Sequence, residues 1–215
     1  MPAEIPIRSF FSFEARCLYR KSPPTIDGAL KDWSDEFKLP DLSEVASEAS
    51  FAEVYTAWNE DGVYLAVAAK GAPGANIDVN RPLKADGFQV WLDTRDVRDA
   101  HRAGRYCHHF FFLPGKGQRK PKAGQVRIRR ARAHGRVCEP GELVVASRTG
   151  RSGFTLGIHL PASVLTGFDP TENRRFGFTY LLKDTKLGRQ TWTADDPLPV
   201  SYDPSLWGTL ELVDG

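Results

Sequence analysis

The chain has 215 residues, with 29 Lys and Arg against 27 Asp and Glu, and a net charge of +2 at pH 7. A hydrophobic fraction of 41% and a charged fraction of 26% are typical of globular proteins and exclude a disordered or collagen-like chain. No window holds the ~18 consecutive apolar residues that a membrane-spanning helix needs, so no membrane partner is expected. Cys17, Cys107 and Cys138 form no CxxC pair and predict free thiols.

The N-terminal residues carry charges at Glu4, Arg8 and Glu14, where a secretory leader needs an unbroken apolar run. The sequence therefore predicts a cytoplasmic protein, or an extracellular or periplasmic one if a leader has been removed. The length suits one large domain, and no repeat or low-complexity linker divides it. We expect a single domain over residues 1–215.

Short apolar runs follow one another along the whole chain, separated by Gly, Pro, Asn and Asp. They are rich in Val, Ile, Phe, Tyr, Trp and Thr, and many alternate with period two, which predicts strands. The runs lie at 10–19, 51–59, 62–70, 87–93, 106–113, 125–133, 142–148, 153–160, 176–183 and 206–213. A short polar turn closed by Gly62 joins the second and third runs and predicts a hairpin.

Only two stretches have a helical pattern, residues 29–37 and 161–168. In the second, Pro161 takes a first helical position and Gly167 lies beyond the end. Many strands with almost no helix predict an all-β fold. We expect an antiparallel two-sheet β-sandwich of the jelly-roll or immunoglobulin-like kind, with one or two short helical turns.

Residues 115–136 form a basic segment with nine Lys or Arg and no acidic residue, which leaves 20 basic against 27 acidic residues elsewhere. Such a segment can hold phosphate groups through counterion release, or it can be a solvated hairpin that extends from the domain. No aromatic residue is interleaved for base stacking. We therefore expect a basic hairpin insert and no nucleic-acid partner.

Six motifs then follow one another in a recognisable order. They are PPTIDGALKDWS (23–34), VYTAWNEDGVYLAVAAK (54–70), ADGFQVWLDTRD (85–96), GFTLGIHLPASVL (153–165), RFGFTYLLKDT (175–185) with TW (191–192), and DPSLWGTLEL (203–212). This order resembles carbohydrate-binding module family 9, within the DOMON-like group of β-sandwiches. The resemblance covers about residues 23–213 and implies the same sandwich fold.

The resemblance also implies a non-catalytic domain that binds a polysaccharide or oligosaccharide on one sheet face, as an accessory to a glycoside hydrolase. In the sugar-binding members two tryptophans clamp the sugar. Their positions fall here at Leu83 and Ser201, with Tyr202 as the nearest aromatic residue, so the usual clamp is lost. The family's carboxylate, guanidinium and amide positions on this face fall at Gln89, Phe111 and Leu181.

The stretch 106-YCHHFFFL-113 raises the question of a metal site. Strand side chains alternate between faces, so His109 shares a face with Cys107 and Phe111, and the adjacent His108 points the other way. The resemblance places Phe111 on the sugar-binding face, which implies that His109 lies there too and that His108 points to the core or its rim. A zinc ion would need two further ligands, and no second Cys/His pair is present. We expect ordinary strand residues and no metal. Structural calcium, known in some relatives, could use Asp27 and Asp32, but a turn explains both and no full ligand set can be mapped.

The expected ligand-binding residues share the face of His109 or border it. Trp91 or Phe111 would stack on a pyranose ring, and polar side chains would bind its hydroxyls. The full set is Gln89, Trp91, His109, Phe111, Lys183, Trp192 and Tyr202.

Two alternatives remain open. Some DOMON-like relatives bind haem, and His109 with Lys183 would be the axial pair here because the single methionine is Met1. The apolar sheet face could instead contact a small aromatic ligand or another protein. Catalysis is not expected, because the chain has no GxSxG, HExxH, P-loop or dinucleotide motif and no recognisable pair of catalytic carboxylates.

Overall fold

The computed structural model describes residues 7–42, 50–70 and 77–214. In this part of the chain the regular structure is eleven strands and a few short 3₁₀ turns, so the prediction of an all-β fold is confirmed. None of the helical turns in these residues is long and apolar enough to cross a membrane.

The strands begin and end close to the predicted runs. They are β1 (Glu14–Tyr19), β2 (Ala52–Asn59), β3 (Gly62–Lys70), β4 (Gly87–Asp93), β5 (Cys107–Leu113), β6 (Lys122–Val126), β7 (Val144–Thr149), β8 (Gly153–Pro161), β9 (Arg175–Asp184), β10 (Gly188–Thr191) and β11 (Gly208–Val213). Each predicted run overlaps one strand, and only the short β10 has no predicted counterpart. The described 3₁₀ turns are η1 (Ile7–Phe10), η2 (Asp35–Phe37), η4 (Ala162–Val164) and η5 (Pro204–Leu206).

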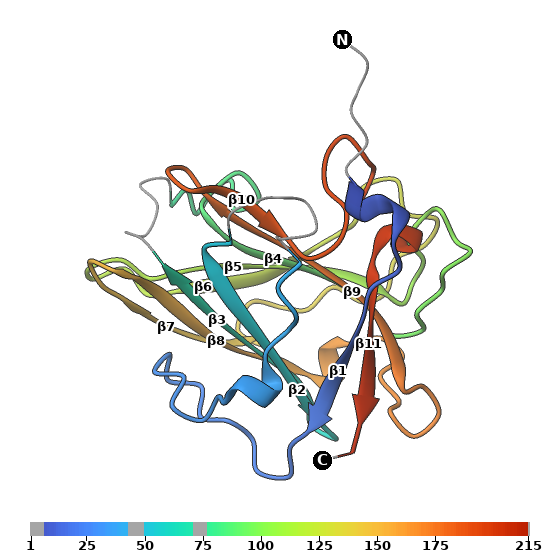
Figure 1. Ribbon diagram of the computed structural model, residues 1–215, viewed down its shortest axis with the longest axis horizontal. Coiled ribbons are helices and arrows are strands. Elements are labelled where there is room, and N and C mark those ends of the chain that lie inside the picture. The colour runs from blue at the N-terminus through green and yellow to red at the C-terminus, as the bar shows by residue number, and fades with distance from the viewer. Residues whose placement is uncertain (1–6, 43–49, 71–76, 215) are drawn as a thin grey trace.

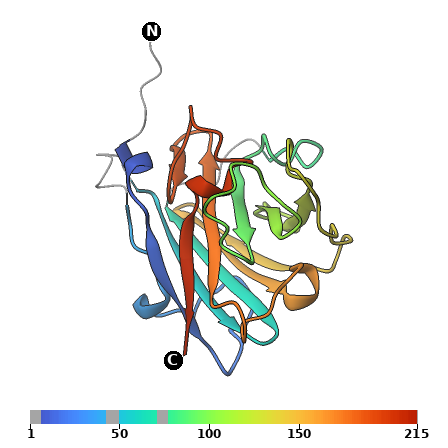
Figure 2. The same ribbon diagram turned by 90° about the vertical axis from the view of Figure 1, so that its right-hand side faces the viewer.

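The strands form one sheet in the order β6-β5-β4-β9-β11-β1-β2-β3-β8-β7, with β10 paired to β9. The sheet curls until it is nearly closed, so that two layers face each other across the core (Figures 1 and 2). All neighbours are antiparallel except β1, which is parallel to both β11 and β2. The sequence does not predict these two parallel contacts, because parallel pairing between distant segments leaves no local turn signal.

The core lies between the two layers and is built by alternation. Phe88, Val90 and Leu92 of β4 turn inward, and Phe110 and Phe112 of β5 join them. They belong to the same buried cluster as Leu65, Val67, Leu156 and Ile158 from the opposite layer, on β3 and β8. The residues between them in β4 and β5 must therefore face outward. This alternation creates the outer face on which the candidate site lies.

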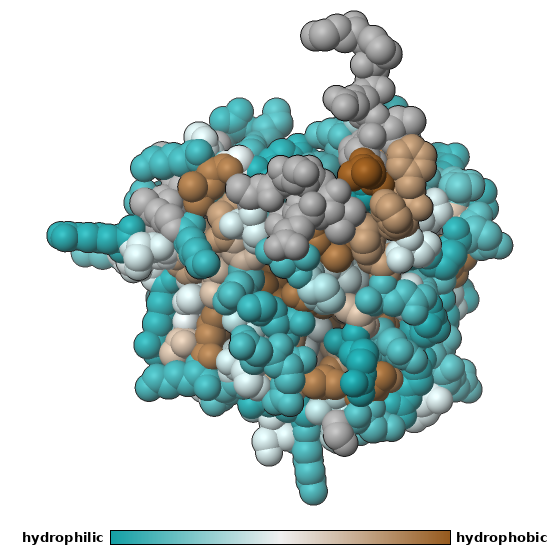
Figure 3. Space-filling model, in the orientation of Figure 1, coloured by the Kyte–Doolittle hydropathy of each residue, from teal (hydrophilic) through white to brown (hydrophobic). Residues whose placement is uncertain are grey.

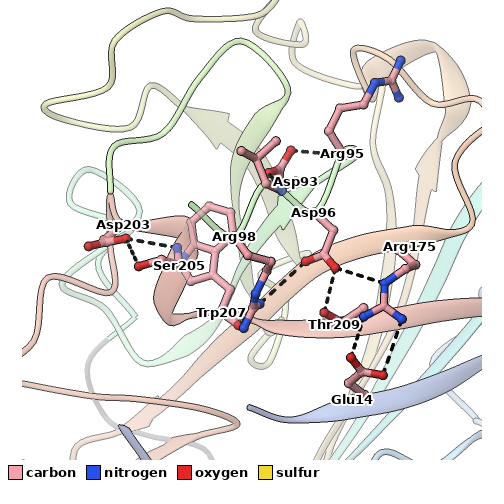
Figure 4. A network of polar contacts seen from close by, with 11 residues as sticks. Glu14, Asp93, Arg95, Asp96, Arg98, Arg175, Asp203, Ser205, Trp207 and Thr209 are labelled. Atoms are coloured by element: carbon pink, nitrogen blue, oxygen red, sulfur yellow. Dashed lines mark hydrogen bonds and ion pairs between the residues drawn. The ribbon is translucent and has the colours of Figure 1, made fainter. Parts of the chain in front are cut away.

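A polar network fastens the end of β4 to the strands beside it (Figure 4). Asp96, in the turn after β4, accepts a hydrogen bond of 2.8 Å from the Thr209 hydroxyl and lies 3.5 Å from the Arg175 guanidinium. Arg175 also binds Glu14 of β1. Asp93 accepts hydrogen bonds from the backbone amides of residues 95 and 97. These acidic residues hold the turn together.

The basic segment 115–136 divides into two parts. Its first half forms β6, which pairs with β5, and so only the start of the run predicted at 125–133 is a strand. Its second half is irregular and folds back over the outer face of β4, where Ile128 is 4% exposed and packs in one cluster with Trp91. Arg136 then binds Glu142. The insert thus covers part of the sheet face.

Candidate functional site

A pocket of about 290 Å³ lies on the outer face of β5, β4 and β9. Its floor includes Gln89 and Trp91 of β4, His109 of β5 and Leu181 of β9. The register brings them together, because Trp91 lies opposite His109 and Gln89 lies opposite Leu181. Gln89, Trp91 and His109, three of the residues expected from alternation, therefore meet at one pocket.

The walls of this pocket come from both flanks of the floor. β6 lies outside β5, and the segment after it contributes Arg127 and Arg129. β10 lies beside β9, and it and the loop after it contribute the opposite wall: Arg189, Thr191, Ala194, Asp195, Asp196, Leu198, Val200 and Ser201. Leu83, just before β4, and Tyr180 of β9 complete the lining.

The floor side chains are fixed by contacts with one another. The rings of Trp91 and His109 are stacked, with centroids 4.2 Å apart and planes inclined by 17°. The His109 Nε2 lies 3.0 Å from the Gln89 Oε1, and the Gln89 amide donates to the Leu83 carbonyl oxygen at 3.3 Å. The indole N–H of Trp91 is buried and has no acceptor among the described residues. A buried donor without a partner is unusual in a protein interior, and it belongs here to a residue of the pocket.

Burial gives the two adjacent histidines a common electrostatic property. It lowers the pKa of His109 to about 3 and that of His108 to about 4. The two rings point apart, since His108 lies 2.9 Å from the Gln125 amide and stacks on Phe110 while His109 faces the pocket. Both histidines are therefore neutral at pH 7.

We expect stability to fall as the pH drops below about 6.5, the ordinary histidine pKa. Between that pH and the folded-state pKa values, the unfolded chain binds protons that the folded chain does not, so the free energy of unfolding rises with pH. Above this window the stabilising contribution of the neutral histidines is fully present. The slope is about 1.4 kcal/mol per pH unit for each histidine. His109→Phe, which keeps a ring on Trp91, should lower the slope by up to about 1.4 kcal/mol per pH unit in urea titrations between pH 5 and 6.5. His134→Phe, at an exposed position, is the control, and an unchanged slope in His109→Phe would contradict the neutral buried state.

Four of the expected site residues do not line the pocket. Phe111 is 6% exposed, and its ring packs closely on Gly124 of β6, which covers it. The ammonium group of Lys183 donates to the Lys84 carbonyl oxygen at 2.7 Å. Tyr202 lies beside the pocket, in the cluster of Trp91, under the Arg130 guanidinium.

The fourth, Trp192, is in the main core and only 1% exposed. Its neighbour Thr191 lines the pocket, and successive residues of an extended segment point to opposite sides. Trp192 was expected among the binding residues, whereas its side chain points to the core and that of Thr191 to the pocket.

The sequence analysis also missed most of the wall. Arg127 and Arg129 lie in a segment expected to extend away from the domain, whereas it folds back because Ile128 is buried. A single apolar residue within the run of arginines is the one signal that could have indicated this. The loop after β10 has no alternation, and no pattern in it predicted a wall.

The residues proposed for a calcium site hold turns. The Asp27 carboxylate accepts from the Ala29 amide and pairs with Arg148, and the Asp32 carboxylate accepts from the Thr25 amide. Among residues 7–42, 50–70 and 77–214, no three His, Cys, Asp or Glu side chains gather as ion ligands. Burial, together with the nearby Asp93, raises the pKa of the Cys107 thiol to about 12, so Cys107 is a protonated thiol at neutral pH.

The axial pair considered for haem does not fit this geometry. The Nε2 atom of His109 faces the Gln89 oxygen, its ring is stacked on Trp91, and Lys183 is bound to a backbone carbonyl outside the pocket. Met1 lies outside the described residues. His109 and Lys183 therefore do not face a common iron position in this structure.

No family model matches this chain, and no curated protein matches it either. Its fold is similar to that of a carbohydrate-binding module family 9 domain from Caldicellulosiruptor kristjanssonii in complex with cellotriose, with a TM-score of 0.63 at 15% identity over 94% of this chain and 95% of that one. The complex of such a domain with glucose gives 0.61 at 14% identity, covering 94% and 97%. A candidate carbohydrate-binding protein from Bacteroides uniformis gives 0.55 at 14%, covering 94% and 99%. Over nearly its whole length, this chain has the fold of carbohydrate-binding module family 9.

Proposed function

We propose that this domain is a non-catalytic carbohydrate-binding module that takes a saccharide in the pocket on β5, β4 and β9. The observation that carries the proposal is that the clamp positions inferred from the resemblance lie in the pocket that the structure forms. Leu83 and Ser201, the positions that the resemblance assigns to the missing clamp, both line the pocket where Gln89, Trp91 and His109 meet.

The pocket offers the two kinds of contact that sugars use. Leu181, Leu198 and Val200 supply apolar surface for the C–H face of a ring. The Gln89 amide and the carboxylates of the far wall supply partners for hydroxyl groups. With aliphatic or small residues at the clamp positions, we expect weak binding, with dissociation constants of millimolar to micromolar order.

The carboxylates of the pocket support a binding role rather than hydrolysis. The acidic residues among its lining are Asp195 and Asp196, which are adjacent and both bound to Arg189. A glycosidase needs two carboxyl groups that flank the scissile bond from different sides. The domain would accordingly act as an accessory that holds a hydrolase near its polysaccharide.

The apolar residues of the sheet face are too well covered to form a protein-contact surface, which supports the saccharide-binding proposal. Trp91 and Phe111 are 5% and 6% exposed, because the insert and β6 cover them. The most exposed large apolar side chains, Phe10 and Phe11, precede β1 instead. The part of the surface shown in Figure 3 is mostly hydrophilic, and its apolar residues form several separate patches.

Restoring the clamp is expected to strengthen binding. Leu83→Trp and Ser201→Trp should each tighten saccharide binding about fivefold, because one aromatic contact contributes about 1 kcal/mol. Calorimetric titration against glucose, cello-oligosaccharides and a wider glycan panel measures the effect. Leu187→Trp, at an exposed turn position that does not line the pocket, is the matched control and should change nothing. If neither the unaltered protein nor the double variant bound any saccharide, the proposed function would be wrong.

A further inference from the structure

Two arginines in the pocket have no counter-charge. Arg127 and Arg129 are exposed residues of its wall, and no hydrogen bond or ion pair joins either guanidinium to another described residue. Other basic residues of the same segment are engaged: Lys122 binds the Val79 carbonyl oxygen, and Arg136 binds Glu142.

The backbone on both sides of these two arginines is fixed. Val126 pairs with His109 at the end of β6, and the Arg132 amide donates to the Ala103 carbonyl oxygen at 2.8 Å. Between the arginines, Ile128 is buried against the cluster of Trp91. The position of their backbone is therefore set by the fold and does not depend on a ligand.

The opposite wall does not neutralise them. Its acidic residues are already bound to Arg189, whose guanidinium lies 2.5 Å from Asp195 and 2.9 Å from Asp196. β6 and β10 lie on opposite flanks of the floor, so the paired carboxylates and the two arginines of the insert stand on different walls. The lining contains three guanidinium groups against two carboxylates, and its unpaired positive charge lies on the wall of the insert.

We propose that the pocket takes an acidic saccharide, whose carboxylate or sulfate group binds Arg127 and Arg129 while the sugar lies against the floor of Gln89, Trp91 and Leu181. The inference rests on the proposed function and names its substrate class. Guanidinium groups suit both anions, because their parallel N–H donors match two oxygens at once. A single-stranded nucleic acid fits less well, because Trp91 is 5% exposed and offers no free ring face for a base.

The test compares anionic and neutral forms of the same sugar. Oligogalacturonide, its methyl ester and a sulfated oligosaccharide are titrated by calorimetry into the full chain at low and moderate salt. We expect the two anionic ligands to bind at least tenfold more tightly than the ester, with affinity that falls as salt rises. The double variant Arg127→Gln/Arg129→Gln should lose at least tenfold for both and leave the ester unchanged.

The control removes the same charge elsewhere in the segment. Lys116→Gln/Lys120→Gln alters two cations that do not line the pocket and should leave all affinities within about twofold. An equal loss in this control would assign the effect to net charge and overturn the inference, as would tight binding of an oligonucleotide that depends on all four residues. Neutral saccharides that bind as well as acidic ones would overturn the inference and leave the proposed function standing. Failure of every saccharide would overturn both.

Discussion

Replacing Trp192 by alanine is expected to lower the free energy of unfolding by about 3–5 kcal/mol. Trp192 is 1% exposed, and its ring meets Phe178 edge-on with centroids 5.7 Å apart. The ring also lies directly on the backbone of β11, since a Cβ built on Gly208 would fall 2.5 Å from it. Alanine would leave a cavity where β9 and β11 meet, which urea unfolding measures as a lower midpoint.

Two companion variants separate packing from a role in binding. Trp192→Phe should cost less because it leaves a smaller cavity, and Leu187→Ala, at a position 45% exposed, should stay within about 0.5 kcal/mol. Below its unfolding midpoint, Trp192→Ala should bind saccharide within about twofold of the unaltered protein. If a folded Trp192→Ala protein failed to bind saccharide, Trp192 would have a role in binding, contrary to this prediction.

Replacing Trp91 by alanine is expected to weaken saccharide binding by at least about thirtyfold, which corresponds to about 2 kcal/mol, because this buried ring holds the floor and one wall of the pocket in place. Trp91 borders the pocket and at the same time supports it, through the stacked ring of His109 and through the cluster that holds Ile128 in place. Its loss would therefore free the His109 ring and loosen the wall of the insert.

Because Trp91 is buried, stability must be measured beside affinity. Trp91→Phe keeps an aromatic ring against His109 and should retain the fold with an intermediate loss of binding. Near-ultraviolet circular dichroism and the unfolding midpoint show which fraction is folded, and affinities are compared per folded molecule. Unchanged affinity in a folded Trp91→Ala protein would move the binding site away from this pocket.

The strands could be predicted from sequence because alternation is a local property. Alternation along β5 separated Phe110 from His109, and the family resemblance indicated which of the two faces the core, as the structure has them. The parallel neighbours of β1 could not be predicted, since residues 14–18 pair with residues 209–213 across almost the whole chain. The short β10 has too few residues to show a pattern.

The floor of the candidate site followed from the same alternation, but its walls did not. Gln89, Trp91 and His109 lie on strands, and the family resemblance together with alternation placed them on one face. Arg127 and the loop that contains Asp195 are irregular, and their position depends on tertiary packing such as the burial of Ile128. Sequence could therefore identify what the ligand would rest on, but not what would surround it.

The parallel pairing of β1 with β11 has a consequence for how the protein is made. β1 acquires one of its two neighbours only when β11, almost 200 residues later, has emerged from the ribosome. Until then β1 has an unpaired edge on that side, and β9 also lacks the strand that pairs with it there. Folding of this domain is consequently tied to the appearance of β11, and a chain that stops before residue 208 would lack the strand that joins β9 to β1.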